Sequence, residues 1–184
     1  QESIASWEDY SRAALHLLDR AGDFKQSTVI EVGPGDGALL SELAQRSAKL
    51  CALDNSEEML HAAHQNTREI SNIEYHLSEP KTLIKERGTS AAAVINMVLH
   101  HAAQPAALVR DTALLLRPGG ELIISDLCPH DQAWAREHCG DLWLGFSPED
   151  LRAWATAAGL EHCAELFFAQ RNGFQIQVQH FKRC

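Results

Sequence analysis

Short apolar segments with the composition of strands alternate with helix-like segments along most of the chain. The first is residues 28–32, and four more lie at residues 50–53, 73–77, 92–97 and 122–127. β-Branched, nearly continuous apolar segments of this length are typical of strands buried on both faces of a parallel sheet. Because strands that alternate with helices imply βαβ crossovers, the sequence predicts an α/β fold with a doubly wound, mainly parallel sheet.

Helix start and stop signals occupy the intervals between these strands. A helix is expected at residues 38–46, and Ser56 is placed to cap the helix that follows it. Another is expected at residues 104–116, closed by an Arg-Pro-Gly-Gly turn at 117–120. A Ser-Pro-Glu-Asp start predicts the last helix, over residues 147–158.

Both ends of the chain add elements to this alternation. Residues 1–23 carry apolar side chains at helical spacing, which predicts a leading amphipathic helix. An Asn-Gly pair at 172–173 separates two strand-like segments, 164–169 and 174–181, and this is a hairpin signal. We therefore expect a sheet of seven strands whose last strand is antiparallel.

The composition limits the partners of such a domain. A chain of 184 residues is long enough for one well-buried domain, so residues 1–184 are taken as a single unit. There are 25 acidic against 16 basic side chains and no basic stripe, which excludes a direct nucleic acid contact. No apolar segment is long enough to cross a bilayer, and five scattered cysteines without a C-x-x-C pair indicate reduced thiols. We expect a cytoplasmic protein.

A glycine-rich turn joins the first predicted strand to its helix, with the sequence Glu-Val-Gly-Pro-Gly-Asp-Gly at residues 31–37. Glycines let a ligand approach the backbone, and the amides at a helix start favour an anionic group. Gly33, Gly35 and Ala38 also satisfy the relaxed G-x-G-x-x-A dinucleotide pattern, with Asp54 at the distance of a ribose contact. The turn alone predicts a nucleotide-like ligand and leaves a NAD-linked oxidoreductase open.

Glu31 favours one class of ligand. A carboxylate before the turn suits a ligand with an ammonium and a sulfonium better than one with two phosphates. With the terminal hairpin, the chain resembles the class I S-adenosylmethionine-dependent methyltransferases, whose motifs are matched at residues 31–37, 53–60, 96–101, 117–120 and 158–159. The resemblance implies a Rossmann-like sheet, S-adenosyl-L-methionine as cofactor, and methyl transfer to an unidentified small-molecule acceptor.

A narrower resemblance concerns the Leu-His-His sequence at 99–101 and the segments 126–131 and 140–146. They are similar to methyltransferase domains fused behind an ArsR-type winged-helix repressor. This implies an N-terminal DNA-binding domain and a homodimer in a longer protein, with a role in transcription regulation, and it agrees with a start at Gln1. A domain that senses S-adenosylmethionine or S-adenosylhomocysteine without turnover is therefore an alternative.

The resemblance also implies which residues hold the cofactor. The glycines carry the backbone around its methionine part, and Asp54 accepts hydrogen bonds from both ribose hydroxyls. Asn55 lies against the adenine, and Ser78 or Glu79 stands where the family places a polar group on the adenine amine. Carbonyls near Asn96 meet the ammonium. The predicted cofactor-binding set is Glu31, Gly33, Pro34, Gly35, Gly37, Asp54, Asn55, Met59, Ser78, Glu79, Asn96 and Met97.

His100 and His101 are the predicted catalytic pair, because a neutral imidazole near pH 7 can accept a proton from a methyl acceptor. A structural role for each stays open. The methyl group is already activated on the sulfonium, so positioning in a dry pocket can supply much of the rate.

The segment before the last helix, residues 128–148, predicts an inserted lid. Four metal-capable side chains are concentrated in it, namely His130, Asp131, His138 and Cys139. No HExxH or paired-cysteine signature accompanies them, so a polar lid is favoured and no metal site is predicted. The apolar side of the lid is expected to come from Trp134, Trp143, Leu144 and Phe146, with plain core packing as the alternative.

Overall fold

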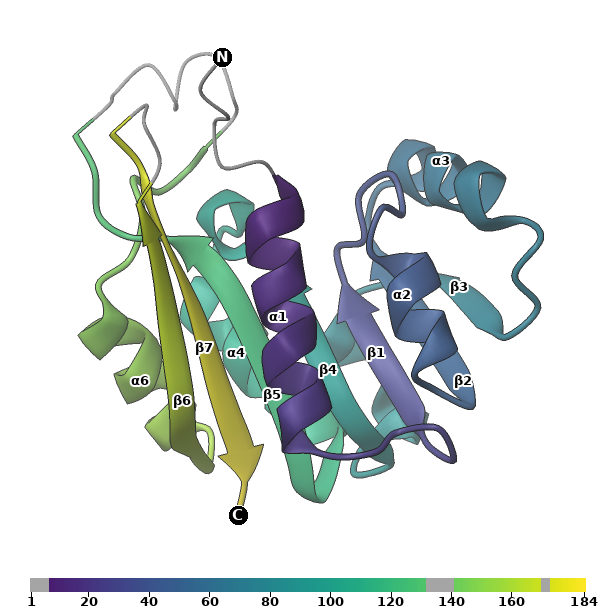
Figure 1. Ribbon diagram of the computed structural model, residues 1–184. Helices are drawn as coiled ribbons and strands as arrows, with labels where there is room; N and C mark the ends of the chain where they lie inside the picture. Colours follow the sequence, from purple (N-terminus) through teal and green to yellow (C-terminus); the bar gives the residue numbers. More distant parts are fainter. Residues whose placement is uncertain (1–6, 132–140, 170–172) are drawn as a thin grey trace.

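The computed structural model of the protein describes residues 7–131, 141–169 and 173–184 (Figure 1). Its strands are β1 Thr28–Val32, β2 Lys49–Asp54, β3 Ile73–Leu77, β4 Ser90–Asn96, β5 Leu116–Leu127, β6 Leu160–Ala169 and β7 Gln175–Arg183. Its helices are α1 Trp7–Ala21, α2 Leu40–Gln45, α3 Glu57–Thr67, α4 Pro105–Leu115 and α6 Pro148–Ala157, with short 3₁₀ turns η1 Pro80–Thr82, η2 Ile84–Glu86 and η3 Leu99–His101.

The strands form one sheet of seven in the order β3-β2-β1-β4-β5-β7-β6. β1 to β5 are parallel to one another, and β7 is antiparallel to both β5 and β6. The predicted seven-strand sheet with its antiparallel last strand is confirmed. The strand order reverses between β1 and β4, and in open α/β sheets ligands bind outside the carboxyl ends of strands at such a point. In Figure 1 the carboxyl end of β1 points to the upper edge of the sheet.

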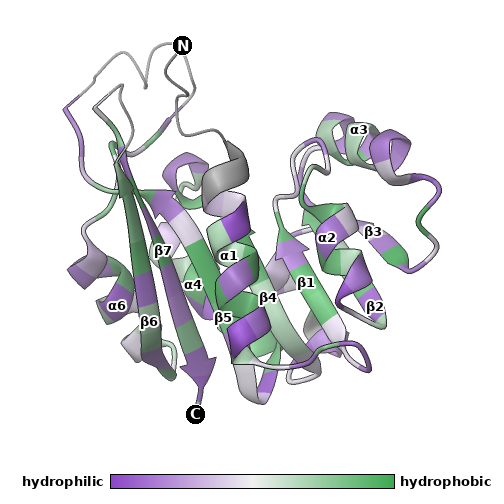
Figure 2. Cartoon of the chain, in the orientation of Figure 1, coloured by the Kyte–Doolittle hydropathy of each residue, from purple (hydrophilic) through white to green (hydrophobic). Residues whose placement is uncertain are grey.

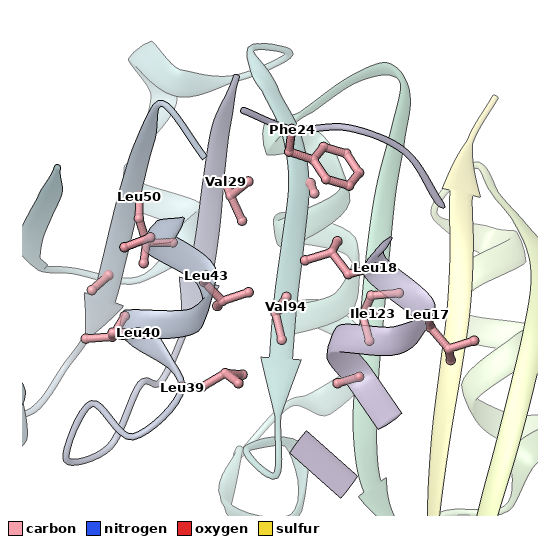
Figure 3. Packing of buried hydrophobic residues seen from close by; sticks show 14 of the residues in the cluster. Leu17, Leu18, Phe24, Val29, Leu39, Leu40, Leu43, Leu50, Val94 and Ile123 are labelled. Carbon is pink, nitrogen blue, oxygen red and sulfur yellow. The ribbon is translucent and has the colours of Figure 1, made fainter. Parts of the chain in front are cut away.

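The two faces of the sheet carry separate hydrophobic cores. On one face α1, α2 and α3 bury Leu18, Leu43 and Ala63, and Figure 3 shows Leu18 and Leu43 directed at the central strands. On the other face α4 and α6 bury Val109 and Leu151. Because both faces are covered, a central strand such as β4 is buried along almost its whole length, and in Figure 2 β1 is largely hydrophobic, with a hydrophilic part toward its carboxyl end.

Two serine caps begin the helices where the sequence predicted them. The hydroxyl of Ser56 accepts a hydrogen bond from the amide of Met59 at 3.3 Å, and that of Ser147 accepts one from Asp150 at 3.1 Å. α2 begins later than expected, at Leu40, because the turn continues through residue 39 and no side chain caps its end. α1 ends at Ala21, and residues 1–6 of the predicted leading helix lie outside the described part.

The Arg-Pro-Gly-Gly sequence corrects one prediction. Residues 117–120 were expected as a turn between a helix and a strand, but they lie within β5. Leu116 pairs with Ser90 and Glu121 pairs with Ala92, so four residues of β5 lie opposite one residue of β4 in a bulge-like shift of register. Gly119 adopts a φ of 79° there, a left-handed conformation that glycine tolerates.

No helix in the described part of the chain has both the length and the apolar character that a membrane crossing needs.

Candidate active site

A cleft of about 520 Å³ opens at the carboxyl ends of β1, β2 and β3. Five residues of the predicted cofactor set line it, namely Gly33, Asp54, Asn55, Ser78 and Glu79. His101 also lines the cleft, as do Val98 and Leu142, whereas His100 does not. A more open hollow of about 790 Å³ lies over α3 and Tyr75, but none of the strand-end residues lines it. We therefore take the strand-end cleft as the site.

The glycines of the turn all adopt left-handed backbone conformations, with φ of 69° at Gly33, 60° at Gly35 and 89° at Gly37. A Cβ added to Gly33 would lie 2.6 Å from Val98 Cγ2. The amide of Gly33 donates to the carbonyl of Leu53 at 2.7 Å. Each position therefore needs glycine for its backbone conformation, and Gly33 also needs it for space.

Gly35 and Gly37 contribute differently to the turn. A Cβ added to Gly37 would lie 3.2 Å from Ala63 Cα, so this glycine lets the turn approach α3. A Cβ on Gly35 would lie 3.8 Å from Met59 Cε, which is an ordinary contact. Met59 thus lies next to Gly35, but neither of them lines the cleft, and neither do Glu31, Pro34 and Gly37.

Glu31 is buried in β1, immediately before the turn, with only 2% of its surface exposed. Its Oε1 atom has no hydrogen-bond partner among the described residues. Burial, aided by the charge of Asp36, raises the pKa of Glu31 to about 8. A buried, unpartnered carboxyl next to the cleft favours a cationic group bound nearby, because such a group would stabilise its ionised form.

The ends of β2 and β3 are locked together beside the cleft. Asp54 Oδ1 accepts from the amide of Ser56 at 3.0 Å, and the carbonyl of Asp54 accepts from the amide of Ser78 at 2.9 Å. The hydroxyl of Ser78 is buried without a partner among the described residues. Asn55 donates to Glu79 at 3.4 Å, and the pKa of Glu79 is lowered chiefly by Lys81, which lies 3.1 Å away. Polar groups therefore converge on this part of the cleft.

Asn96 is the last residue of β4, and its side chain makes hydrogen bonds to other residues of the protein. Its amide donates to the Ser11 hydroxyl at 3.3 Å, and its oxygen accepts from Ser125, so it joins α1, β4 and β5. Met97 follows with a φ of 59°, the only positive φ among the described non-glycine residues. Neither residue lines the cleft, so only their backbone carbonyls remain as predicted contacts of the cofactor.

The two histidines differ in their surroundings. His100 is 6% exposed, and its Nδ1 lies 2.8 Å from Asp126 Oδ1. Burial lowers the pKa of His100, but the hydrogen bond and charge of Asp126 outweigh it, so the net shift is upward. The side chain of His101 is 46% exposed, and its Nδ1 lies 3.5 Å from Asp141 Oδ1. Of the predicted catalytic pair, only His101 can meet a molecule in the cleft.

Asp126 and Asp141 were not among the predicted site residues. Both are almost fully buried, and Asp141 lies 3.7 Å from His100 Nε2 as well as close to His101. Asp126 follows the apolar segment of β5. A carboxylate at the carboxyl end of a buried parallel strand is the sequence signal that could have identified it as a site residue.

The expected lid is only partly described. Leu142 and Trp143 donate their amides to the carbonyl of His100 at 2.9 and 3.2 Å, and Leu142 lines the cleft. Phe146 is not a lid residue: it is 4% exposed and packs in the core, with its ring 5.4 Å from that of Trp154. Of the other residues placed in the lid, Leu144 is partly buried and His130 packs edge-on against Phe174. The predictions for Trp134, His138 and Cys139 lie outside the described residues.

Comparison with known proteins assigns this site to a family. A family model described as a methyltransferase domain matches residues 6–176. A ubiquinone biosynthesis O-methyltransferase of Xanthomonas axonopodis pv. citri is 30% identical over 148 residues, covering 72% of this chain and 62% of the relative. The chain thus spans less than two thirds of that relative's length.

Solved structures share the fold at low sequence identity. The N-methyltransferase NodS from Bradyrhizobium japonicum, in complex with S-adenosyl-L-homocysteine, has a TM-score of 0.79 at 19% identity, covering 96% of this chain and 86% of its own. The [4+2]-cyclase SpnF has a TM-score of 0.82 at 16% identity, covering 100% and 84%. Since a cyclase shares the fold, the fold alone does not fix the chemistry. The family assignment rests on the match to the family model. The chain belongs to the methyltransferase domain family.

Proposed function

We propose that this domain binds S-adenosylmethionine in the strand-end cleft and transfers its methyl group to a small-molecule acceptor. The observation that carries the proposal is Glu31, a buried carboxyl without a partner among the described residues, directly before a three-glycine turn whose first glycine, Gly33, lines the cleft. An ammonium or sulfonium near this carboxyl supplies the positive charge that its ionised form lacks. A dinucleotide would instead bring two phosphates toward an acid.

The residues that line the cleft fit the rest of this cofactor. Asp54 is placed to accept from ribose hydroxyls, and the unpartnered hydroxyl of Ser78 and the Asn55–Glu79 pair offer polar contacts to the adenine. Gly33 leaves the backbone at the cleft without a side chain that would keep a ligand away. Met59 approaches the same turn from α3.

The chemistry asks little of the protein beyond positioning. When bound, S-adenosylmethionine supplies a methyl group already activated on a sulfonium. The protein's part is to hold the acceptor in line and to exclude water, for which Val98 and Leu142 provide apolar walls. We assign His101 to the acceptor side because it lines the cleft, and we assign the buried His100 a positioning role.

Calorimetric titration tests cofactor binding. We expect the chain to bind S-adenosylhomocysteine and not NAD⁺, and we expect Asp54→Ala to weaken that binding roughly 10- to 100-fold, the loss typical of a hydrogen bond to a charged group. Asp23→Ala, in an exposed loop, serves as the control and should bind like the wild type. Tight NAD⁺ binding without S-adenosylhomocysteine binding would overturn the proposal in favour of an oxidoreductase.

A second proposal concerns a longer protein that contains this domain. The resemblance of residues 99–101, 126–131 and 140–146 to ArsR-fused domains supports a sensor that binds the cofactor, dimerises and acts through an attached DNA-binding domain. The free thiols of Cys51, Cys128, Cys163 and Cys184 fit a reducing cytoplasm. Cofactor binding without methylated product, across a panel of thiols, phenols, amines and arsenite, would favour this sensor, whereas any methylated product favours the enzyme.

A further inference from the structure

Three groups of side chains in the described part of the chain could each hold a metal ion. They are Cys51 with Glu74 and His76, Glu121 with Cys163 and His180, and His100 with His101 and Asp141. In each group the nearest ligand atoms all lie within 4.8 Å of one another. Their surroundings separate the three.

The cluster at Cys51 has poor ligands. Burial raises the pKa of the Cys51 thiol to about 11, so the thiolate that binds metals is disfavoured. Glu74 already contacts Lys49 at 3.7 Å and His76 at 3.4 Å. A cation would have to displace the lysine and deprotonate the thiol.

The cluster at Glu121 is closed by a direct bond. His180 Nε2 lies 2.6 Å from Glu121 Oε2, so the two atoms that would hold a metal already share a hydrogen bond. Burial also raises the pKa of the third member, Cys163. This group is complete without an ion.

The cluster of His100, His101 and Asp141 has a different geometry. Asp141 Oδ1 lies 3.7 Å from His100 Nε2 and 3.5 Å from His101 Nδ1, and both distances are too long for a hydrogen bond. Ligand atoms around a tetrahedral zinc ion with arms of about 2.0 to 2.1 Å are roughly 3.3 to 3.4 Å apart. The two distances to Asp141 exceed this spacing by a few tenths of an ångström, and the nitrogen atoms of the two histidines lie within 4.8 Å of each other.

Asp126 fixes the orientation that such a ligand needs. Nδ1 of His100 lies 2.8 Å from the carboxylate of Asp126, so a neutral ring that donates its Nδ1 proton there would turn the lone pair of Nε2 toward Asp141. A carboxylate behind a histidine is the usual outer contact of a metal-binding imidazole, because it sets the tautomer and raises the basicity of the ligand. Asp126 is itself fully buried and held by the amides of His100 and Leu127.

The local charge also favours a cation. Asp126 and Asp141 are two almost fully buried carboxylates on either side of one imidazole. Two buried carboxylates are costly unless cations or hydrogen bonds compensate their charges. A divalent ion between the histidines and Asp141 compensates the pair.

We propose that His100, His101 and Asp141 bind one divalent cation of the zinc type, with Asp126 as the outer partner of His100. Two imidazoles and one carboxylate suit zinc or a similar first-row ion better than Mg²⁺ or Ca²⁺, which prefer all-oxygen sites. Three protein ligands leave a fourth position, and His101 and Leu142 place it beside the cleft. Resting on the proposed function, we assign this position to an oxygen atom of the methyl acceptor.

The test is metal binding itself. After chelator treatment, titration with Zn²⁺ should show one site on the wild type, lost in His101→Gln and Asp141→Asn and weakened roughly 10- to 100-fold in Asp126→Asn. His101 is half exposed, so its variant should fold, which a thermal melt of the metal-free protein checks. Glu74→Gln and Cys163→Ser, in the other two clusters, should bind Zn²⁺ like the wild type.

Cobalt substitution identifies the ligands. We expect visible bands of four- or five-coordinate Co²⁺ without the near-ultraviolet band of a thiolate ligand. No zinc binding by the folded wild type, or binding that survives His101→Gln and fails in Cys163→Ser, would overturn the inference. S-adenosylhomocysteine binding measured on the same samples separates the two proposals, since it needs no metal and its loss concerns the cofactor site alone.

Discussion

Glu31 combines near-complete burial with a pKa of about 8, so its ionisation acts against folding. Because this folded-state pKa lies above the ordinary value of 4.5, the unfolded state releases its proton first as pH rises. The stabilisation that the neutral carboxyl provides is present below about pH 4.5 and is lost as pH rises through about 8. The raised pKa of Glu31 therefore makes the free energy of unfolding fall as pH rises from about 4.5 to about 8.

Glu31→Gln keeps the shape of the side chain and removes the titration. We expect wild type to lose stability relative to this variant by about 1 kcal/mol per pH unit between roughly pH 5 and pH 8. Urea unfolding of both proteins across this range measures the difference. Glu69→Gln, on the exposed surface after α3, is the matched control and should follow the wild type at every pH. Parallel curves for Glu31→Gln and wild type would contradict the assignment.

Alanine substitutions at Gly33 and Gly88 separate two effects on stability, namely the cost of a left-handed backbone conformation and the cost of a steric contact. Gly33→Ala places a Cβ 2.6 Å from Val98 in a left-handed conformation, whereas Gly88→Ala has a φ of 72° with nothing within 4 Å. We expect Gly88→Ala to cost about 1 kcal/mol in unfolding free energy, from backbone conformation alone. Gly33→Ala should cost roughly 1 to 3 kcal/mol more, from overpacking.

A double variant checks the cause. Val98→Ala removes the methyl groups that Gly33→Ala would meet, so the double variant should be more stable than the two single losses added together. Strict additivity in urea unfolding would mean that the contact with Val98 is not what makes Gly33 necessary.

At the scale of elements, α3 begins next to the cleft and α6 begins away from it, and both start with a serine cap. Ser56→Ala and Ser147→Ala should each cost about 1 kcal/mol in unfolding free energy. Only Ser56→Ala should also weaken S-adenosylhomocysteine binding, because the Ser56 hydroxyl fixes the start of α3 and, with it, the amide that donates to the carboxylate of Asp54. Equal binding by the two variants would show that the cap does not position Asp54.

Most elements could be predicted from the sequence because residues within or next to each element determine where it begins and ends. β1 and β3 have their predicted bounds, since their apolar segments end at turn residues. The bulge at residues 117–120 could not be predicted, because it depends on the pairing of Leu116 with Ser90 on another strand. In the same way, Asp141 lies beside the histidines only in the folded protein, where the amides of Leu142 and Trp143 donate to the carbonyl of His100, although its separation from them in the sequence is large.

At the scale of the whole molecule, the sheet and its cleft behave as one unit whose stability responds to the bound cofactor. A ligand that binds only the folded state at about 100 times its dissociation constant adds about 2.7 kcal/mol. For a domain of this size we expect S-adenosylhomocysteine to raise the melting temperature by roughly 5 to 10 °C. NAD⁺ should leave the melting temperature unchanged, and thermal unfolding measured with each ligand compares the two directly. A shift with NAD⁺ alone would contradict the assignment.

The same scale explains why the fold was predictable and the chemistry less so. Alternating strands and helices specify the doubly wound sheet, and the terminal hairpin specifies the antiparallel β7. Glu31 and the glycine turn indicate the ligand class because their chemistry is local. Which residue meets the acceptor depends on tertiary burial, which places His101 in the cleft and His100 beneath the surface although the two are adjacent in the sequence.

The position of β7 between β5 and β6 has a consequence for biosynthesis. β6 leaves the ribosome before the strand that attaches it to the sheet, while β1 to β5 can already pair among themselves. Until residues 175–183 emerge, β5 presents an open edge and β6 has no partner strand in this sheet. Exposed strand edges recruit other chains. A ribosome that stalls just short of β7 would therefore release a nascent chain that is largely folded and prone to aggregate.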